Sequence, residues 1–120
     1  MKIAIDVCWV KVGGEAPEAY LRKYAGRAPV VHLKVFSGEK SEHMYGLIGK
    51  DAEMAEKPNT FAFRPVGYGR QDIPSILEAA EEAGSEWIVV EQDELGMGLD
   101  AMTCARMGVK HLQSLLRVFE

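Results

Sequence analysis

Three short apolar runs, each followed by a segment with helical spacing, predict strands that alternate with helices. The runs are rich in Val and Ile, as strands are: KIAIDVCW (2–9), PVVHLKVF (29–36) and EWIVVEQ (86–92). Strands that alternate with helices form βαβ units, so the pattern predicts a parallel sheet in an α/β domain. Near-continuous apolar strands agree, because both faces of a parallel sheet are usually covered.

Pro, Asp and Gly mark the predicted helix ends. Pro17 suits the first turn of a helix that continues through EAYLRKYA and ends near Gly26. Asp72 caps a helix over IPSILEAAEEAG, and Gly84 ends it. Asp100 opens the last helix. Apolar residues recur along it at helical spacing and predict a stripe that faces the core: Ala105, Val109, Leu112, Leu116 and Phe119.

Two segments lack a regular period. VKVGG (10–14) predicts a turn after the first strand. Residues 37–59 are polar and rich in charge, with three glycines, and predict an exposed loop that has room for a short helix. A loop of this length usually covers a functional site.

Composition limits the function classes. At 120 residues the chain is long enough for one core, and we predict a single domain over residues 1–120. The net charge of −4, without any cluster of Lys and Arg, argues against nucleic acid or an anionic membrane as partner. No apolar run approaches the ~18 residues of a membrane span, and no signal sequence is recognised. Cys8 and Cys104 are expected to be reduced, buried thiols of a cytoplasmic protein.

One polar residue stands near the end of each predicted strand. Asp6 follows KIAI, His32 follows PVV and Glu91 follows WIVV. The carboxyl ends of parallel strands share one edge of the sheet, where α/β proteins bind ligands, so we expect the three side chains to converge. A single such residue would be explained more simply as a capped or hydrogen-bonded polar group. Three in corresponding positions favour a shared site.

Two carboxylates and an imidazole form a ligand set for a divalent metal, and Mn²⁺, Mg²⁺, Co²⁺ and Zn²⁺ all suit it. Such a site can hold a polyol through adjacent oxygens and polarise a carbonyl while a carboxylate moves a proton. Lys34 lies two residues beyond His32, on the same face of the strand. It could stabilise an oxyanion or a phosphate, or it could be an ordinary lysine that reaches into solvent.

The segments that carry these residues resemble a known family. IDVCWVKVGG, VVHLKVF, FRPVGYGRQDIPSILEAAEEAGSEWIVVEQDE and the closing helix are similar to the C-terminal part of sugar phosphate isomerase/epimerase proteins with the xylose isomerase-like TIM barrel. HLK and VEQD are the most specific parts. The resemblance covers nearly the whole chain. It implies that the three strands correspond to the sixth, seventh and eighth βα units of a (β/α)8 barrel.

The resemblance also implies a metal site and a reaction. Family members hold a divalent metal with a Glu from the fifth strand and an Asp, a His and a Glu from the next three. The last three fall on Asp6, His32 and Glu91, and the fifth-strand Glu has no counterpart here. The implied reaction is aldose–ketose isomerisation or epimerisation of a sugar or sugar phosphate. Glu91 would bind metal and transfer the proton, and Lys34 or Arg70 would contact substrate oxygens.

Two positions depart from the family pattern. The family usually reads H-L-K-D where this chain has Val35, and often G-E-G where it has Tyr68. Both changes remove an acid near the expected substrate pocket. A full barrel needs about 250 residues, so we expect the chain to form a partial (β/α)8 barrel, the tail of a barrel as a separate chain.

Three interpretations stay open. The chain could be an enzyme fragment that completes itself as a homo-oligomer, a non-catalytic oligomeric module that binds metal or sugar, or an independent α/β module of similar architecture. With one carboxylate of the proton-transfer pair missing, the sequence does not decide whether this chain alone is an enzyme. Open strand edges favour association. Barrel-facing apolar residues would otherwise lack a partner layer: Ile3, Ile5, Val7 and Val89.

Overall fold

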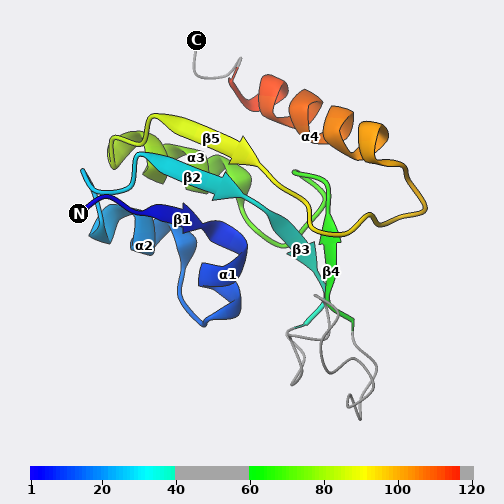
Figure 1. The fold of residues 1–120 in the computed structure, drawn as a ribbon, viewed down its shortest axis with the longest axis horizontal. Coiled ribbons are helices and arrows are strands. Elements are labelled where there is room, and N and C mark those ends of the chain that lie inside the picture. The colour runs from blue at the N-terminus through cyan, green and yellow to red at the C-terminus, as the bar shows by residue number, and fades with distance from the viewer. Residues whose placement is uncertain (40–59, 117–120) are drawn as a thin grey trace.

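Three parallel strands form the sheet that the sequence predicts. The computed structural model describes residues 1–39 and 60–116. In it, β1 (Ala4–Asp6), β2 (Val30–Leu33) and β5 (Trp87–Val90) lie side by side in the order β1-β2-β5 (Figure 1). Both pairings are parallel. The chain is therefore an α/β domain with a parallel three-stranded sheet.

Two helices cover one face of this sheet, and they begin where the sequence predicts. α2 (Pro17–Lys23) has its proline in the first turn. α3 (Ile73–Glu82) begins after Asp72, whose carboxylate accepts a hydrogen bond from the backbone N–H of Ser75. The two helices pack against each other behind the sheet (Figure 1). Neither helix covers the opposite face of the sheet (Figure 1).

The core lies between the sheet and these helices. Val31 on β2 and Ile76 on α3 are fully buried in it. Ile5 and Val7 are buried in the same cluster, so the expectation that they face an open barrel interior is wrong. Side chains alternate along a strand, and Ile5 shares the helix-covered face with its register partner Val31. Ile3 packs partly against this core as well.

The segment after β1 is a helix, where the sequence predicted more strand and a turn. α1 (Val7–Val12) begins directly after Asp6. The Asp6 carboxylate accepts hydrogen bonds from the backbone N–H groups of Cys8 and Trp9, at 2.9 and 3.1 Å. Asp is among the best N-cap residues, and this signal outweighs the β propensity of the Val-rich sequence. The predicted strand is wrong beyond Asp6, and α1 takes up most of the predicted turn.

The second predicted strand is broken at Lys34. β2 ends one residue earlier, and β3 (Val35–Ser37) pairs antiparallel with β4 (Ala62–Arg64) instead of continuing in the sheet. Gln71, which is 6% exposed, satisfies the backbone at the break. Its amide Nε2 donates to the Lys34 carbonyl at 2.8 Å, and its Oε1 accepts from the backbone N–H of Phe36 at 3.1 Å.

The long polar loop predicted at 37–59 lies mostly outside the described residues, from residue 40 on. Its first residue, Ser37, ends β3. Among the helices that the structure describes, none is long and apolar enough to cross a membrane.

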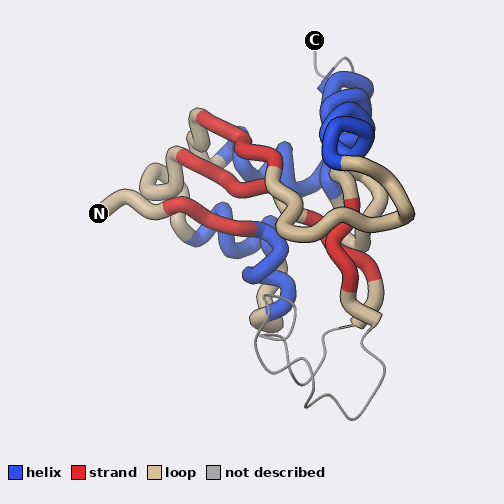
Figure 2. The backbone as a smooth tube through the Cα atoms, turned by 45° about the vertical axis from the view of Figure 1, so that its right-hand side comes forward, coloured by secondary structure: helices blue, strands red, loops and turns tan. Residues whose placement is uncertain are grey.

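α4 (Ala101–Leu116) stands apart from the two helices behind the sheet (Figure 2). Its first turn is capped as predicted: the Asp100 carboxylate accepts a hydrogen bond from the backbone N–H of Thr103 at 2.7 Å. The residues that α4 turns towards the rest of the protein form one row, buried at its start and partly buried at its end: Cys104, Gly108, Leu112 and Leu115.

The predicted core stripe of α4 is therefore wrong at two positions. Ala105 and Val109 are exposed, Val109 at 47%, because the buried row runs one residue earlier. Gly108 explains the difference, since a Cβ there would lie 3.4 Å from the Cβ of Val66 and the helix approaches closely at this point. Leu112 is partly buried as expected. The side chains of Leu116 and Phe119 lie outside the described residues.

β5 forms an open edge of the sheet. All four of its residues are exposed, with Trp87 at 67% and Val89 at 41%. Val89 pairs in register with His32 and shares the face opposite α2 and α3. No element among residues 1–39 and 60–116 covers that face (Figure 2). Among the described residues, Val89 therefore has no layer packed against it.

Candidate metal centre

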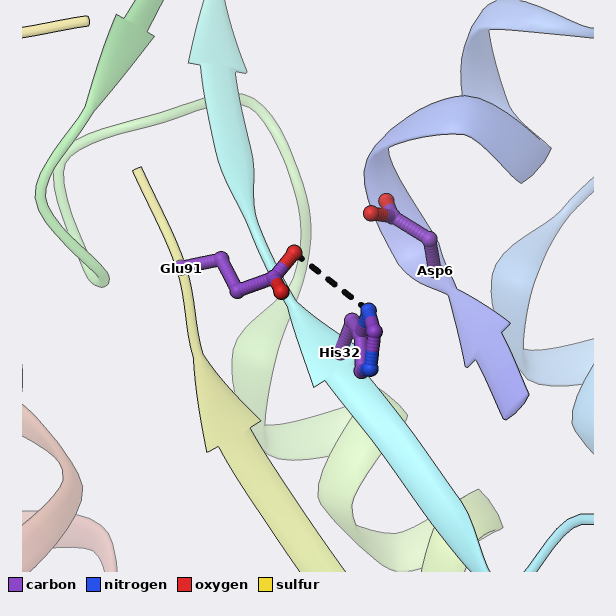
Figure 3. A group of neighbouring side chains, drawn as sticks. All are labelled: Asp6, His32 and Glu91. Carbon is purple, nitrogen blue, oxygen red and sulfur yellow. Dashed lines mark ion pairs between the residues drawn. The ribbon is translucent and has the colours of Figure 1, made fainter. Parts of the chain in front are cut away.

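Asp6, His32 and Glu91 meet at the carboxyl edge of the sheet. Asp6 ends β1 and pairs in register with His32 of β2, and Glu91 directly follows β5. Each residue offers one ligand atom, and these atoms all lie within 4.8 Å of one another (Figure 3). Glu91 Oε2 lies 3.3 Å from His32 Nδ1. The structure brings the three side chains together as expected. That they bind a metal stays a prediction.

The two carboxylate oxygens of Asp6 have different partners. Oδ1 caps α1 through two backbone N–H groups. Oδ2 lies 3.1 Å from the ammonium nitrogen of Lys34. The cap therefore holds the carboxylate in one orientation and leaves Oδ2 directed into the cluster. Asp6 is thus both the first residue of a structural motif and the most constrained of the three candidate ligands.

The ammonium group of Lys34 lies inside this cluster. Lys34 is only 5% exposed, so the alternative of a lysine that reaches into solvent is wrong. Its Nζ lies 3.1 Å from Asp6 Oδ2, 3.3 Å from Glu91 Oε2 and 3.1 Å from Asp93 Oδ2. The ring of Trp9 lies on another side, with its centroid 5.6 Å from Nζ. Three carboxylates and an aromatic ring thus surround one buried cation.

Asp93 and Trp9 are the neighbours that sequence reasoning missed. Asp93 lies in the VEQD segment, two residues after Glu91. The only sequence feature that pointed to Asp93 as part of the cluster is this second acid close to Glu91. The sequence predicts that Trp9 belongs to the first strand, and in an extended strand its side chain would not face Lys34. In α1 it stands one turn from Asp6 and reaches Lys34.

The surroundings keep Lys34 charged and Cys8 uncharged. Burial by itself lowers the pKa of Lys34, but hydrogen bonds to Asp6 and Asp93 outweigh burial and hold its pKa above the usual value. Burial, with the nearby Asp6 charge, raises the pKa of Cys8 to about 12. The thiol is therefore protonated at neutral pH in the metal-free protein. Cys8 and Cys104 are both buried and unpaired, as expected.

Arg70, the other predicted substrate contact, is engaged elsewhere. Its guanidinium donates to the Gly38 carbonyl at 2.9 Å and lies 3.3 Å from the Glu39 carboxylate. Val35 is 1% exposed and belongs to the core rather than to the ligand cluster. Tyr68 is 49% exposed. Of the predicted substrate-binding residues, the structure places Lys34 at the candidate centre and directs Arg70 to the start of the polar loop.

Two cavities approach the cluster from opposite sides. A cavity of about 520 Å³ beside β1 is lined by Asp6, Trp9 and Tyr20 among others. A smaller one of about 200 Å³, next to α4, is lined by Glu91, Gln92 and Cys104 among others. The side chains of His32 and Glu91 remain about one-third exposed, at 33% and 32%. The cluster is therefore open to solvent on the uncovered face of the sheet.

The residues present fit a divalent metal. Three ligand atoms bonded to one ion at about 2.1 Å lie about 3 to 4 Å from one another, depending on the coordination geometry. The observed separations, all within 4.8 Å, reach that range with side-chain movements of about 1 Å. Two carboxylates with one imidazole favour Mn²⁺, Co²⁺ or Zn²⁺, and Mg²⁺ suits the oxygens. Asp6, His32 and Glu91 would hold the ion.

Comparison with known proteins adds no family assignment: no family model matches the chain, and no curated protein does. The resemblance to isomerase/epimerase proteins therefore stays an expectation from the sequence segments and the strand-end residues described above.

Proposed function

We propose that the chain binds a divalent metal through Asp6, His32 and Glu91 and acts as a sugar isomerase/epimerase-like protein. The single observation that supports this best is the convergence of an O/N ligand set, within 4.8 Å, from the ends of three neighbouring parallel strands. A bound divalent ion would polarise a substrate carbonyl. The proposed substrate is a sugar or sugar phosphate, because a polyol offers adjacent oxygens to such a site.

Glu91 is the residue proposed to transfer the proton. It follows β5 at the open face, and its side chain is 32% exposed, so a substrate can approach it. Its carboxylate would take a proton from the carbon beside the carbonyl and return it to the same or the neighbouring carbon. Lys34 would contact a substrate oxygen, and the N-cap hydrogen bonds of Asp6 would keep that ligand in place.

A second candidate function is metal or sugar binding without catalysis. The observation that favours it is the exposure of the centre, since water that reaches the reacting atoms weakens the electrostatic interactions on which proton transfer depends. The two candidates differ in one measurable property, the exchange of a carbon-bound hydrogen with solvent.

Replacing Glu91 with Gln should abolish hydrogen exchange at the carbon beside the carbonyl. The wild-type chain, loaded with Mn²⁺ or Co²⁺ and incubated with a panel of ketoses in D₂O, is expected to incorporate deuterium at that carbon. Glu91→Gln should reduce the rate by about 10²- to 10⁴-fold, because an amide cannot act as the base. Deuterium is detected by NMR or mass spectrometry.

Glu94→Gln is the matched control, since Glu94 is an exposed acid three residues further along the same segment. It should exchange at the wild-type rate. Absence of exchange in a folded wild-type sample whose metal content has been measured would remove catalysis and leave the binding function. Exchange that survives Glu91→Gln would assign the base to another residue.

We also propose that the three parallel strands are part of a parallel barrel-like arrangement, related to the (β/α)8 barrel, that other copies of the chain complete. The outer edge of β5 is apolar and exposed, and the outer edge of β1 borders the 520 Å³ cavity. Lys2 precedes β1 and Glu86 precedes β5, both exposed. In head-to-tail parallel pairing of β5 with β1 of another copy, these opposite charges would meet. Antiparallel pairing of two β5 strands would instead bring glutamates together.

Val89→Lys should therefore reduce self-association. A lysine on the exposed strand would place a charge in the proposed interface, and we expect the sedimentation coefficient at tens of micromolar protein to fall to that of a monomer. Val109→Lys, at a position of similar exposure on α4, is the matched control and should leave the assembly unchanged. If Val109→Lys dissociates the protein and Val89→Lys does not, the interface lies at α4 and the proposed pairing is wrong.

The two unpaired, buried cysteines suit a reducing compartment. We propose the cytoplasm as the location of the protein.

A further inference from the structure

The ammonium group of Lys34 contacts the same carboxylate oxygens that a metal ion would need as ligands. Its Nζ contacts Oδ2 of Asp6 and Oε2 of Glu91, at 3.1 and 3.3 Å. The same Glu91 oxygen faces His32 Nδ1 at 3.3 Å. An ion bonded at about 2.1 Å to these atoms would share both carboxylates with the ammonium group. Two cations would then compete for one pair of oxygens.

The local charge allows a divalent ion and the Lys34 ammonium group to be present together, but not close to the same oxygens. Asp6, Glu91 and Asp93 carry three negative charges and Lys34 one positive charge, which leaves −2 when His32 is counted as neutral. Without a metal, Lys34 offsets part of the repulsion between the carboxylates. With a divalent ion in place, the total becomes zero, and the repulsion between ion and ammonium favours a longer separation between them.

Asp93 offers Lys34 a position outside the ligand set. Its Oδ2 lies 3.1 Å from Nζ, and its side chain is 38% exposed, more than that of Asp6 or Glu91. The ring of Trp9 lies near the ammonium group on another side and favours a cation there. A small rotation of the Lys34 side chain could give up Asp6 and Glu91 while keeping Asp93.

We propose that Lys34 is a resident cation that holds the carboxylates of the metal-free centre, and that Asp93 retains its ammonium group when a metal binds. Lys34 thereby sets the metal affinity as a positioning residue and is not itself a ligand. The inference rests on the metal centre of the proposed function. It differs from a purely structural ion pair in one respect: removing the cation must strengthen metal binding, even where it weakens the fold.

The first test is Lys34→Met, titrated with Mn²⁺ and with Zn²⁺ by calorimetry beside the wild type. We expect the variant to bind about 10- to 100-fold more tightly. Lys110→Met, which removes an exposed lysine on α4, controls for the change in net charge and should bind like the wild type. Unchanged or weaker binding by Lys34→Met would overturn the inference.

The second test does not depend on the folding of Lys34→Met. Asp93→Asn keeps the buried cation but removes the carboxylate that retains it, so we expect metal binding about tenfold weaker than in the wild type, with Glu94→Gln unaffected. In the double variant with Lys34→Met, Asp93→Asn should have a much smaller effect. An equal loss in both backgrounds would mean that Asp93 acts on the metal directly, against the inference.

Failure of the inference and failure of the proposed function give different results. If the wild type binds metal and Lys34→Met binds it no better, only the inference fails. If neither binds, both fail. Binding by Lys34→Met alone would support the competition and would show that Lys34 closes the centre in the wild type, against the proposed function.

Discussion

Replacing His32 with Ala is expected to lower the affinity for Co²⁺ or Zn²⁺ by at least ~100-fold. The substitution removes the imidazole of the cluster and leaves Asp6 and Glu91, an acidic pair that Lys34 already compensates. Loss of a residue that merely supports a ligand costs about 10- to 100-fold in metal affinity, so loss of the ligand itself should exceed that range. Isothermal titration calorimetry at fixed pH measures the change.

The fold should survive this substitution, because His32 lies on the uncovered face and is partly exposed. His111→Ala, on α4, is the control histidine and should bind metal like the wild type. A thermal scan gives a second readout, since a metal at 100 times its dissociation constant stabilises the native state by about 2.7 kcal/mol. His32→Ala should lose that metal-dependent rise in Tm. A variant that still binds metal like the wild type would place the ion elsewhere.

The positions of the candidate ligands could be predicted because strand ends are a property of the sequence pattern. Asp6, His32 and Glu91 each follow an apolar run, and parallel strands in register carry such residues to one edge. The surroundings of Lys34 could not be predicted in the same way. They depend on Asp93, which comes from the loop after β5, and on a break in the backbone that Gln71 stabilises from a distant segment.

The helices were predicted where a cap and a turn residue frame them. Asp72 and Gly84 frame α3, and Pro17 marks the start of α2. Asp6 carries the same kind of signal, but the Val-rich segment behind it has the composition of a strand and predicts a strand instead. Local hydrogen bonds from the cap decide that α1 forms there, and apolar composition alone does not report them.

The exposed apolar surfaces show the limit of reading burial from composition. The four residues of β5 are as apolar as a central strand, yet β5 is an edge and all four are exposed. Val109 has the spacing of a core residue, yet α4 contacts the domain through the neighbouring row. The periodicity of a sequence predicts which face of a helix or strand is apolar. Which residues of that face are buried depends on how the other helices and strands pack against it.

Asp6→Ala and Asp6→Asn should separate the structural role of Asp6 from its role as a ligand. Both variants lack the carboxylate, so both are expected to lose at least ~10-fold in metal affinity. Only alanine also removes the acceptor for the N–H groups of Cys8 and Trp9. Loss of an N-cap costs about 0.5–2 kcal/mol, while Asn caps a helix nearly as well as Asp.

The measurement is urea unfolding in the absence of metal, followed by metal titration of each variant. We expect Asp6→Ala to lower the free energy of unfolding by about 1 kcal/mol relative to Asp6→Asn, since both have lost the same contact with Lys34 and differ mainly in the cap. Lys34 keeps Glu91 and Asp93 as partners in both variants. Equal destabilisation by the two substitutions would show that the negative charge beside Lys34, and not the cap on α1, is what Asp6 contributes to folding.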